Sequence, residues 1–112
     1  MINDATIEYM IAPAIKNLAM DFLTNIRKEN PSEDINIENI NEGCCADFAT
    51  VIWERFQVLG VEITNDEELG AEDYTHTFLS FGGKYFDAET PYGVADWHLL
   101  PIFVRNAAIN TE

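Results

Sequence analysis

Gly43-Cys44-Cys45-Ala46-Asp47-Phe48-Ala49 opens an amphipathic helix that the sequence predicts to run to about Gly60. A cysteine in the first turn of a helix lies near unpaired backbone N–H groups and the positive end of the helix dipole. Both favour the thiolate over the thiol, so they lower the pKa of the cysteine. The stretch therefore predicts a reactive cysteine at the start of a helix.

Helical periodicity separates the two adjacent cysteines. Cys45 lies on the apolar stripe of the helix, whose other members are Phe48, Ala49, Ile52, Phe56 and Leu59. Cys44 lies about 100° around the helix from Cys45, and we take it as the weaker candidate. Neighbouring cysteines can bridge each other only through a strained ring, so the pair does not predict a disulfide framework.

A predicted β-hairpin downstream supplies a histidine and a carboxylate. Its strands flank Gly82-Gly83, and a two-residue glycine turn matches the twist of a tight hairpin. If Phe81 pairs with Lys84, then His76 and Asp87 are diagonal neighbours on one face, about 7–8 Å apart at the backbone and within side-chain reach. A three-residue loop would instead turn Asp87 to the opposite face.

Cysteine, histidine and aspartate in this order form a Cys-His-Asp constellation suited to nucleophilic catalysis. Cys45 would attack the carbonyl carbon of an amide, ester or thioester. His76 would take the thiol proton and later return it to the leaving group, while Asp87 holds the tautomer and orientation of the ring. The oxyanion would be bound by the Cys45 backbone N–H, with Asn41 or Asn39.

Each of these side chains also has an ordinary structural explanation. Taken alone, Cys45 is more often a small core residue, His76 a half-buried ring with its hydrogen bonds satisfied, and Asp87 a turn acid. His98 is an alternative base, with Asp96 beside it, in a segment over residues 94–103 that we expect to form a turn or short helix laying Trp97, Leu99 and Phe103 over the core. The cysteines and histidines lack the paired spacing of a zinc site, so we expect no metal and no cofactor.

The two motifs resemble those of transglutaminase-like proteins. Residues 43–49 are similar to that family's G-x-C-x-D-F-A segment, and residues 76–87 resemble its H-x-W/F strand, turn and closing aspartate. The shape is shared by the wider papain-like superfamily, including the NlpC/P60 peptidases, and the resemblance covers about residues 43–90. It implies a papain-like α+β fold, with N-terminal helices packed on a small antiparallel sheet and Cys45, His76 and Asp87 at the matching positions.

The remaining elements follow from hydrophobic patterning. Apolar residues at helical spacing predict a first helix from Asp4 to about Lys28, capped by Asn3 or Asp4. Pro13 predicts either a kink in this helix or a short first turn followed by a main helix with Pro13 near its N-terminus. The other expectations are a loop over residues 31–42 that buries Ile35, Ile37 and Ile40, a short strand over 61–64, an acidic loop to about Asp73, and fraying over 106–112.

Length and charge limit the function. The 112 residues predict one domain spanning the chain, and 20 acidic against 6 basic residues give a net charge of -14. That charge argues against direct binding to nucleic acid or an anionic membrane, and it favours a basic peptide or protein as substrate. The acidic runs are most simply solvated loops. Without a visible signal peptide or membrane span, the expected compartment is the cytoplasm, where thiols stay reduced.

Two hypotheses result. The first is a small papain-like cysteine hydrolase or acyltransferase that uses Cys45, His76 and Asp87 on an amide or isopeptide-type bond. The alternative is a catalytically inactive acidic binding protein, such as a phage-type inhibitor or a nucleic-acid mimic, whose carboxylates occupy a basic groove on a partner protein.

Overall fold

The computed structural model describes residues 3–110, apart from the side chains of residues 109 and 110. Within that range, four α-helices and a four-stranded antiparallel sheet form an α+β fold, so the predicted fold class is confirmed. The helices are α1 (Asp4–Glu29), α2 (Ile37–Gly43), α3 (Cys45–Phe56) and α4 (Pro101–Asn110), and the strands are β1 (Glu62–Asn65), β2 (Thr77–Phe81), β3 (Lys84–Asp87) and β4 (Thr90–Val94). Short 3₁₀ helices span Gln57–Leu59, Glu67–Leu69 and Trp97–Leu99.

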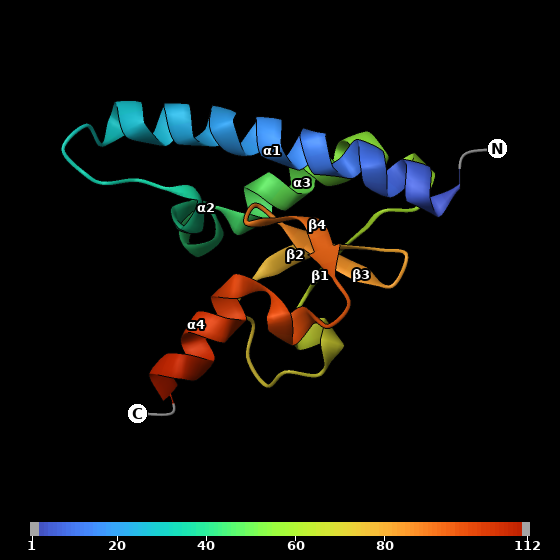
Figure 1. Ribbon diagram of the computed structural model, residues 1–112. Coiled ribbons are helices and arrows are strands. Elements are labelled where there is room, and N and C mark those ends of the chain that lie inside the picture. Colours follow the sequence, from blue (N-terminus) through green and yellow to red (C-terminus); the bar gives the residue numbers. More distant parts are fainter. Residues whose placement is uncertain (1–2, 111–112) are drawn as a thin grey trace.

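The sheet is a meander in the order β1-β2-β3-β4, and helices lie on both sides of it (Figure 1). α1 runs across the top of the molecule with α3 beneath it, α2 lies at one end of the sheet, and α4 is below the strands. Contacts join α1 to β4 and α3 to β2. The start of α3 lies close to the start of β2, because Cys45 Sγ accepts the N–H of Thr77 at 3.5 Å.

The central strand β2 is buried on both faces. Leu79 and Phe81 point into the main core, which also contains apolar residues of α1 and α3. Phe78 is fully buried on the opposite face, where its ring packs edge-to-face against Phe103 of α4 with centroids 5.9 Å apart. Because alternate strand residues face opposite sides, His76 shares the face of Phe78.

The hairpin has the predicted register. Phe81 pairs with Lys84 and Leu79 with Phe86. Gly82 and Gly83 take φ values of 59° and 78°, which glycine adopts readily and other residues avoid. The two-residue turn expected from the sequence is thus confirmed, and the three-residue loop is excluded.

The first helix has the predicted extent but passes through Pro13 without ending. It begins with Asn3, whose side chain accepts the N–H of Thr6, and it continues for 26 residues to Glu29. The alternative of a short first turn followed by a separate main helix with Pro13 near its N-terminus is therefore wrong. Ile7 and Ile11, which precede the proline, are buried in the core, and this burial offsets the hydrogen bond that proline cannot donate. Among residues 3–110, no helix combines the length and apolar character needed to cross a membrane.

The predicted loop over residues 31–42 is wrong in its second half, where α2 forms. A capping box at Asn36 starts this helix, because its side chain accepts the N–H of Glu38 while Asn39 accepts the N–H of Asn36. Ile40 is buried and Ile37 is 37% exposed, so the expected burial of Ile37 is also wrong. The helix turns its other face to solvent.

The C-terminal segment is more ordered than predicted. Residues 106–110 continue α4 instead of fraying, and residues 111–112 lie outside the described part of the chain. Leu99 is 58% exposed, so it does not cover the core as expected. Trp97 and Phe103 do pack together, edge-to-face, with ring centroids 5.0 Å apart.

Two glycines with positive φ differ in how closely the rest of the chain packs around them. Gly93 has φ 80°, and a Cβ there would lie 2.7 Å from a ring carbon of the fully buried Phe86. Gly70 has φ 111°, but a Cβ there would meet open space.

We expect Gly93→Ala to lower the free energy of unfolding by about 3 kcal/mol or more, through backbone strain plus overpacking. Gly70→Ala should lower it by only about 1 kcal/mol, through strain alone. Urea unfolding of both variants measures this; equal losses would contradict the packing argument.

Candidate active site

The hairpin brings His76 and Asp87 into direct contact. His76 precedes β2 and Asp87 ends β3, and His76 Nε2 lies 3.0 Å from Asp87 Oδ2. The side chains are 0% and 2% exposed. The other carboxylate oxygen of Asp87 accepts the backbone N–H of Glu89 at 3.0 Å. The diagonal proximity predicted from the register is thus confirmed.

Aromatic rings fix the plane of the imidazole. His76 stacks on Phe78, with ring centroids 5.6 Å apart and an interplanar angle of 29°, and Phe103 meets it edge-on at 5.8 Å. Since Asp87 occupies Nε2, the free nitrogen is Nδ1. This atom is buried and makes no hydrogen bond to any part of the chain that the structure describes.

Asp66 holds the backbone that leads into β2. Its Oδ1 accepts the N–H groups of Thr75 at 2.9 Å and His76 at 3.2 Å, and the residue is only 3% exposed. The sequence placed Asp66 in an acidic loop expected to be solvated, and for this residue that expectation is wrong. Its burial reflects backbone donors nine and ten residues away, which charge patterning does not reveal.

Cys45 is the first residue of α3, with Cys44 as its N-cap. The thiol is half-buried, and its Sγ accepts the backbone N–H of Thr77 at 3.5 Å. The thiol also lies close enough to the His76 ring for the two groups to influence each other's titration, although the contact does not reach hydrogen-bond geometry. The start of α3 therefore contacts β2 at its first residue, Thr77, directly after the histidine.

The electrostatics favour an ion pair between this thiol and the imidazole. Burial opposes ionisation of Cys45, but the neighbouring His76 and the N–H groups of Thr77 and Ala46 outweigh it and lower the thiol pKa. Burial likewise opposes charge on His76, but Asp87 and Cys45 outweigh it and raise the pKa of the ring to about 9. At neutral pH this arrangement favours thiolate and imidazolium.

The adjacent cysteine has the opposite environment. Cys44 is half-buried and packs against the main core. Burial raises its pKa, and the nearby Asp47 and Cys45 raise it further. Of the two thiols, Cys45 therefore has the better environment for a nucleophile.

An open cleft of about 520 Å³ reaches Cys45. Its walls come from α2, α4 and the segment before β2, and they include Asn41, Tyr74, Ile102 and Arg105. His76 and Asp87 do not line it, because both side chains are buried. A molecule in the cleft therefore meets the thiol first.

Asn41, expected to help bind an oxyanion, lines this cleft and is 2% exposed. Its Nδ2 donates one hydrogen bond to Glu89 Oε2 at 2.7 Å, which leaves the second amide hydrogen for another acceptor. The alternative, Asn39, caps α2 and does not line the cleft. The structure therefore favours Asn41 of the two.

Sequence reasoning missed a charged cluster at the cleft. Arg105 of α4 donates to both carboxylate oxygens of Glu89, at 2.8 and 3.1 Å, and it lies 3.7 Å from Glu38 and 3.8 Å from Glu42. The cluster joins α2, α4 and the turn between β3 and β4. The sequence signal for this cluster was Arg105 itself, a basic residue near the C-terminus of a very acidic chain.

His98, the alternative base, lies in a different setting. It hydrogen-bonds Asp96 through Nδ1 at 2.7 Å and stacks on Trp97, but its side chain is 66% exposed and it does not line the Cys45 cleft. Among the described residues, no group of three or more His, Cys, Asp or Glu side chains is arranged to hold a metal ion.

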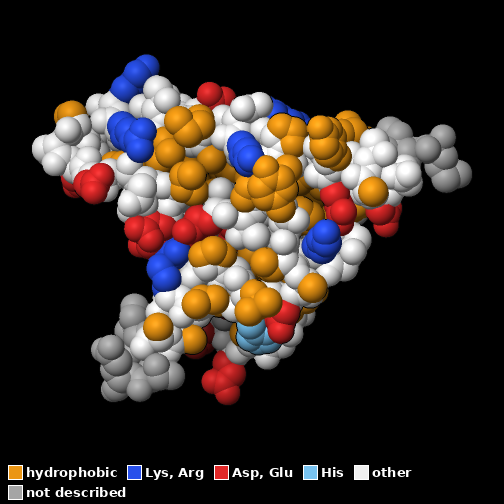
Figure 2. Space-filling model, in the orientation of Figure 1, with side chains coloured by type: hydrophobic (Ala, Val, Ile, Leu, Met, Phe, Trp, Pro, Cys, Tyr) orange, Lys and Arg blue, Asp and Glu red, His pale blue; other side chains and the backbone are white. Residues whose placement is uncertain are grey.

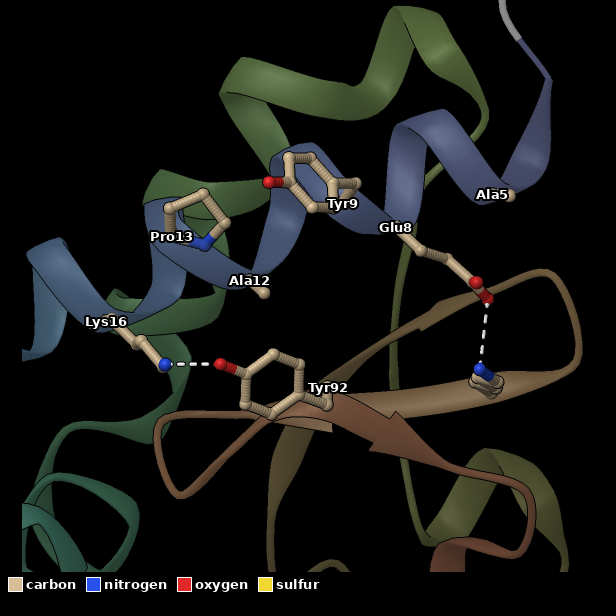
Figure 3. A pocket seen from close by; sticks show the side chains of 8 residues that line it. Ala5, Glu8, Tyr9, Ala12, Pro13, Lys16 and Tyr92 are labelled. Carbon is tan, nitrogen blue, oxygen red and sulfur yellow. Dashed lines mark hydrogen bonds and ion pairs between the residues drawn. The ribbon is translucent and has the colours of Figure 1, made fainter.

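A second groove, of about 490 Å³, lies between α1 and the sheet (Figure 3). Tyr92 of β4 points across it toward α1, where Lys16 donates a hydrogen bond to the Tyr92 hydroxyl, and Glu8 forms an ion pair with Lys84 at 3.5 Å. Neither cysteine nor histidine lines this groove. Of the cysteines and histidines, Cys45 lines the other cleft, and His76 lies buried next to it.

No protein-family model, no curated protein and no solved structure matches this chain. The transglutaminase-like and papain-like assignment therefore stays a prediction.

The raised pKa of His76 can be tested through its carboxylate partner. We expect Asp87→Asn to move the imidazole pKa from about 9 to well below that value, because burial is then opposed only by Cys45. At a pH between the imidazole pKa of the variant and that of the wild type, the wild-type ring is protonated and the variant ring is not. NMR titration of the imidazole measures this. Asp96→Asn, which removes the exposed carboxylate beside His98, is the matched control and should leave His76 unchanged.

Proposed function

We propose that this chain is a small papain-like cysteine hydrolase or acyltransferase that acts on an amide or isopeptide-type bond. Cys45 is the nucleophile, His76 the acid and base, and Asp87 the group that orients the ring. The observation that carries the proposal is the environment of His76. Its Nε2 lies 3.0 Å from Asp87 Oδ2, and its ring lies close to the thiol of Cys45, which starts α3 and lines an open cleft.

The reaction uses each group in turn. The Cys45 thiolate attacks the carbonyl carbon, and the imidazolium gives its Nδ1 proton to the leaving amine as the C–N bond breaks, which leaves a thioester. Water or a second amine then attacks the thioester, Nδ1 accepts its proton, and the thiolate is released. Water gives hydrolysis and an amine gives acyl transfer.

The oxyanion site is built around the start of α3. The backbone N–H of Cys45 belongs to the first helical turn, and Cys44 supplies no side-chain cap to occupy that turn. The free amide hydrogen of Asn41 is the second donor. Together they bind the charge that develops on the carbonyl oxygen.

The net charge of -14 supports a basic peptide or protein as substrate and disfavours nucleic acid and anionic membranes as direct partners. We place this activity in the cytoplasm, where a reduced thiol is maintained. The competing proposal is an inactive acidic protein that blocks a basic groove on a partner. It would bind that partner in a salt-sensitive way, whether or not Cys45 is present.

Alkylation with iodoacetamide tests the nucleophile. At pH 7 we expect Cys45 to react roughly tenfold faster than an unperturbed thiol, because only a few per cent of such a thiol is ionised at that pH. His76→Ala should remove the advantage. The reaction is followed by mass spectrometry of the intact protein.

Cys44→Ser is the matched control, since it removes the neighbouring thiol and should keep the fast reaction. If Cys45 reacts no faster than a free thiol and His76→Ala changes nothing, the enzyme proposal fails. Binding to a basic partner that survives Cys45→Ala unchanged would then support the acidic binding protein.

A further inference from the structure

Glu42 and Arg105 line the Cys45 cleft, and the charged cluster to which they belong carries more negative than positive charge. Three carboxylates, those of Glu38, Glu42 and Glu89, surround the single guanidinium of Arg105. Figure 2 shows acidic side chains gathered beside a basic one between α2 and α4. If all four groups are ionised, the cluster has an excess of two negative charges.

The four groups are not equally engaged. Glu89 holds Arg105 through two hydrogen bonds, at 2.8 and 3.1 Å, and its side chain is 15% exposed. Glu38 and Glu42 approach the guanidinium only to 3.7 and 3.8 Å, beyond hydrogen-bond distance, and are 42% and 52% exposed. Glu89 is therefore the hydrogen-bond partner of the Arg105 guanidinium. The two carboxylates of α2 keep their capacity to bind a second cation.

Their placement on α2 suits one shared ligand. Residues four apart lie on the same face of a helix, with Cβ atoms about 5–6 Å apart, so both carboxylates can contact one ammonium or guanidinium group. Glu42 itself lines the cleft that contains Cys45.

An independent feature supports a reaction centre at this cleft, in addition to an acidic surface. His76 is 0% exposed, and its Nδ1 is a buried polar atom without a hydrogen-bond partner among the described residues. The ring also lies close enough to Cys45, which lines the cleft, to lower the pKa of that thiol. A cation bound at α2 would thus lie at the cleft that opens on the reactive sulfur.

We infer that Glu38 and Glu42 form the subsite that selects the substrate, by binding a cationic group next to the carbonyl that Cys45 attacks. The substrate class is a peptide with a lysine or arginine side chain beside the scissile bond, or an amine. This inference rests on the proposed function. It assigns the preference for basic substrates to two residues of α2 and not to the net charge of the chain.

Charged thiol reagents test the subsite without knowledge of the natural substrate. In a Cys44→Ser background, Cys45 is treated with two methanethiosulfonates of similar size, one carrying a trimethylammonium group and the other a sulfonate. The ratio of their second-order rate constants reports the potential at the sulfur. We expect the cationic reagent to react faster, and Glu38→Gln with Glu42→Gln to lower the ratio at least about threefold at low salt.

The matched control removes two charges elsewhere. Asp21 and Glu54 are exposed, do not line the cleft and lie on α1 and α3. Asp21→Asn with Glu54→Gln should change the ratio by less than half as much. An equal fall in both double variants would assign the selectivity to net charge and overturn the inference, and so would a ratio near one in the unaltered cleft.

Failure of the proposed function has a different signature. If an uncharged methanethiosulfonate reacts with Cys45 no faster than with a free thiol, the nucleophile proposal fails, whatever the charge ratio is. The single variant Glu42→Gln, at an exposed helix position, provides the same measurement if the double variant does not fold; it should lower the ratio in the same direction, and an unchanged ratio would overturn the inference.

Discussion

The hydrogen bond between His76 and Asp87 is the interaction on which the candidate site depends. Both side chains are almost wholly buried, so each removes the cost of burying the other, and losing one partner of such a pair typically costs about 3–5 kcal/mol. The bond exists only because the hairpin keeps its register. A slip of one residue would turn Asp87 to the opposite face of the sheet and leave the imidazole among aromatic rings without a counter-charge.

The residues around this bond restrict the backbone and the ring orientation of the histidine. Asp66 fixes the backbone at residues 75 and 76, while Phe78 and Phe103 fix the ring plane. With Nε2 committed to Asp87, Nδ1 is the nitrogen left for another partner. Packing of α3 against β2 then brings the Cys45 sulfur to the Thr77 N–H, so one contact between a helix and a strand joins thiol and ring.

Local patterns predicted the parts of the site that local structure determines. The glycine turn set the pairing of His76 with Asp87, and the apolar stripe placed Cys45 at a helix start. The burial of Asp66 and the cluster of Glu89 with Arg105 were not predicted, because their partners are backbone groups or side chains that only the tertiary fold brings together. In a chain with 20 acidic residues, charge runs conceal the few carboxylates that do structural work.

The burial of the histidine also constrains how the site would operate. His76 is 0% exposed and does not line the cleft, so its ring does not meet solvent directly. A raised imidazole pKa and a lowered thiol pKa both favour the thiolate–imidazolium pair, the state in which attack on a carbonyl needs no further deprotonation of the thiol. The histidine is therefore shielded from water, while Cys45 lines the open cleft. Asp87 makes this asymmetry possible, since without its charge the buried ring would lose its proton and the thiolate its counter-ion.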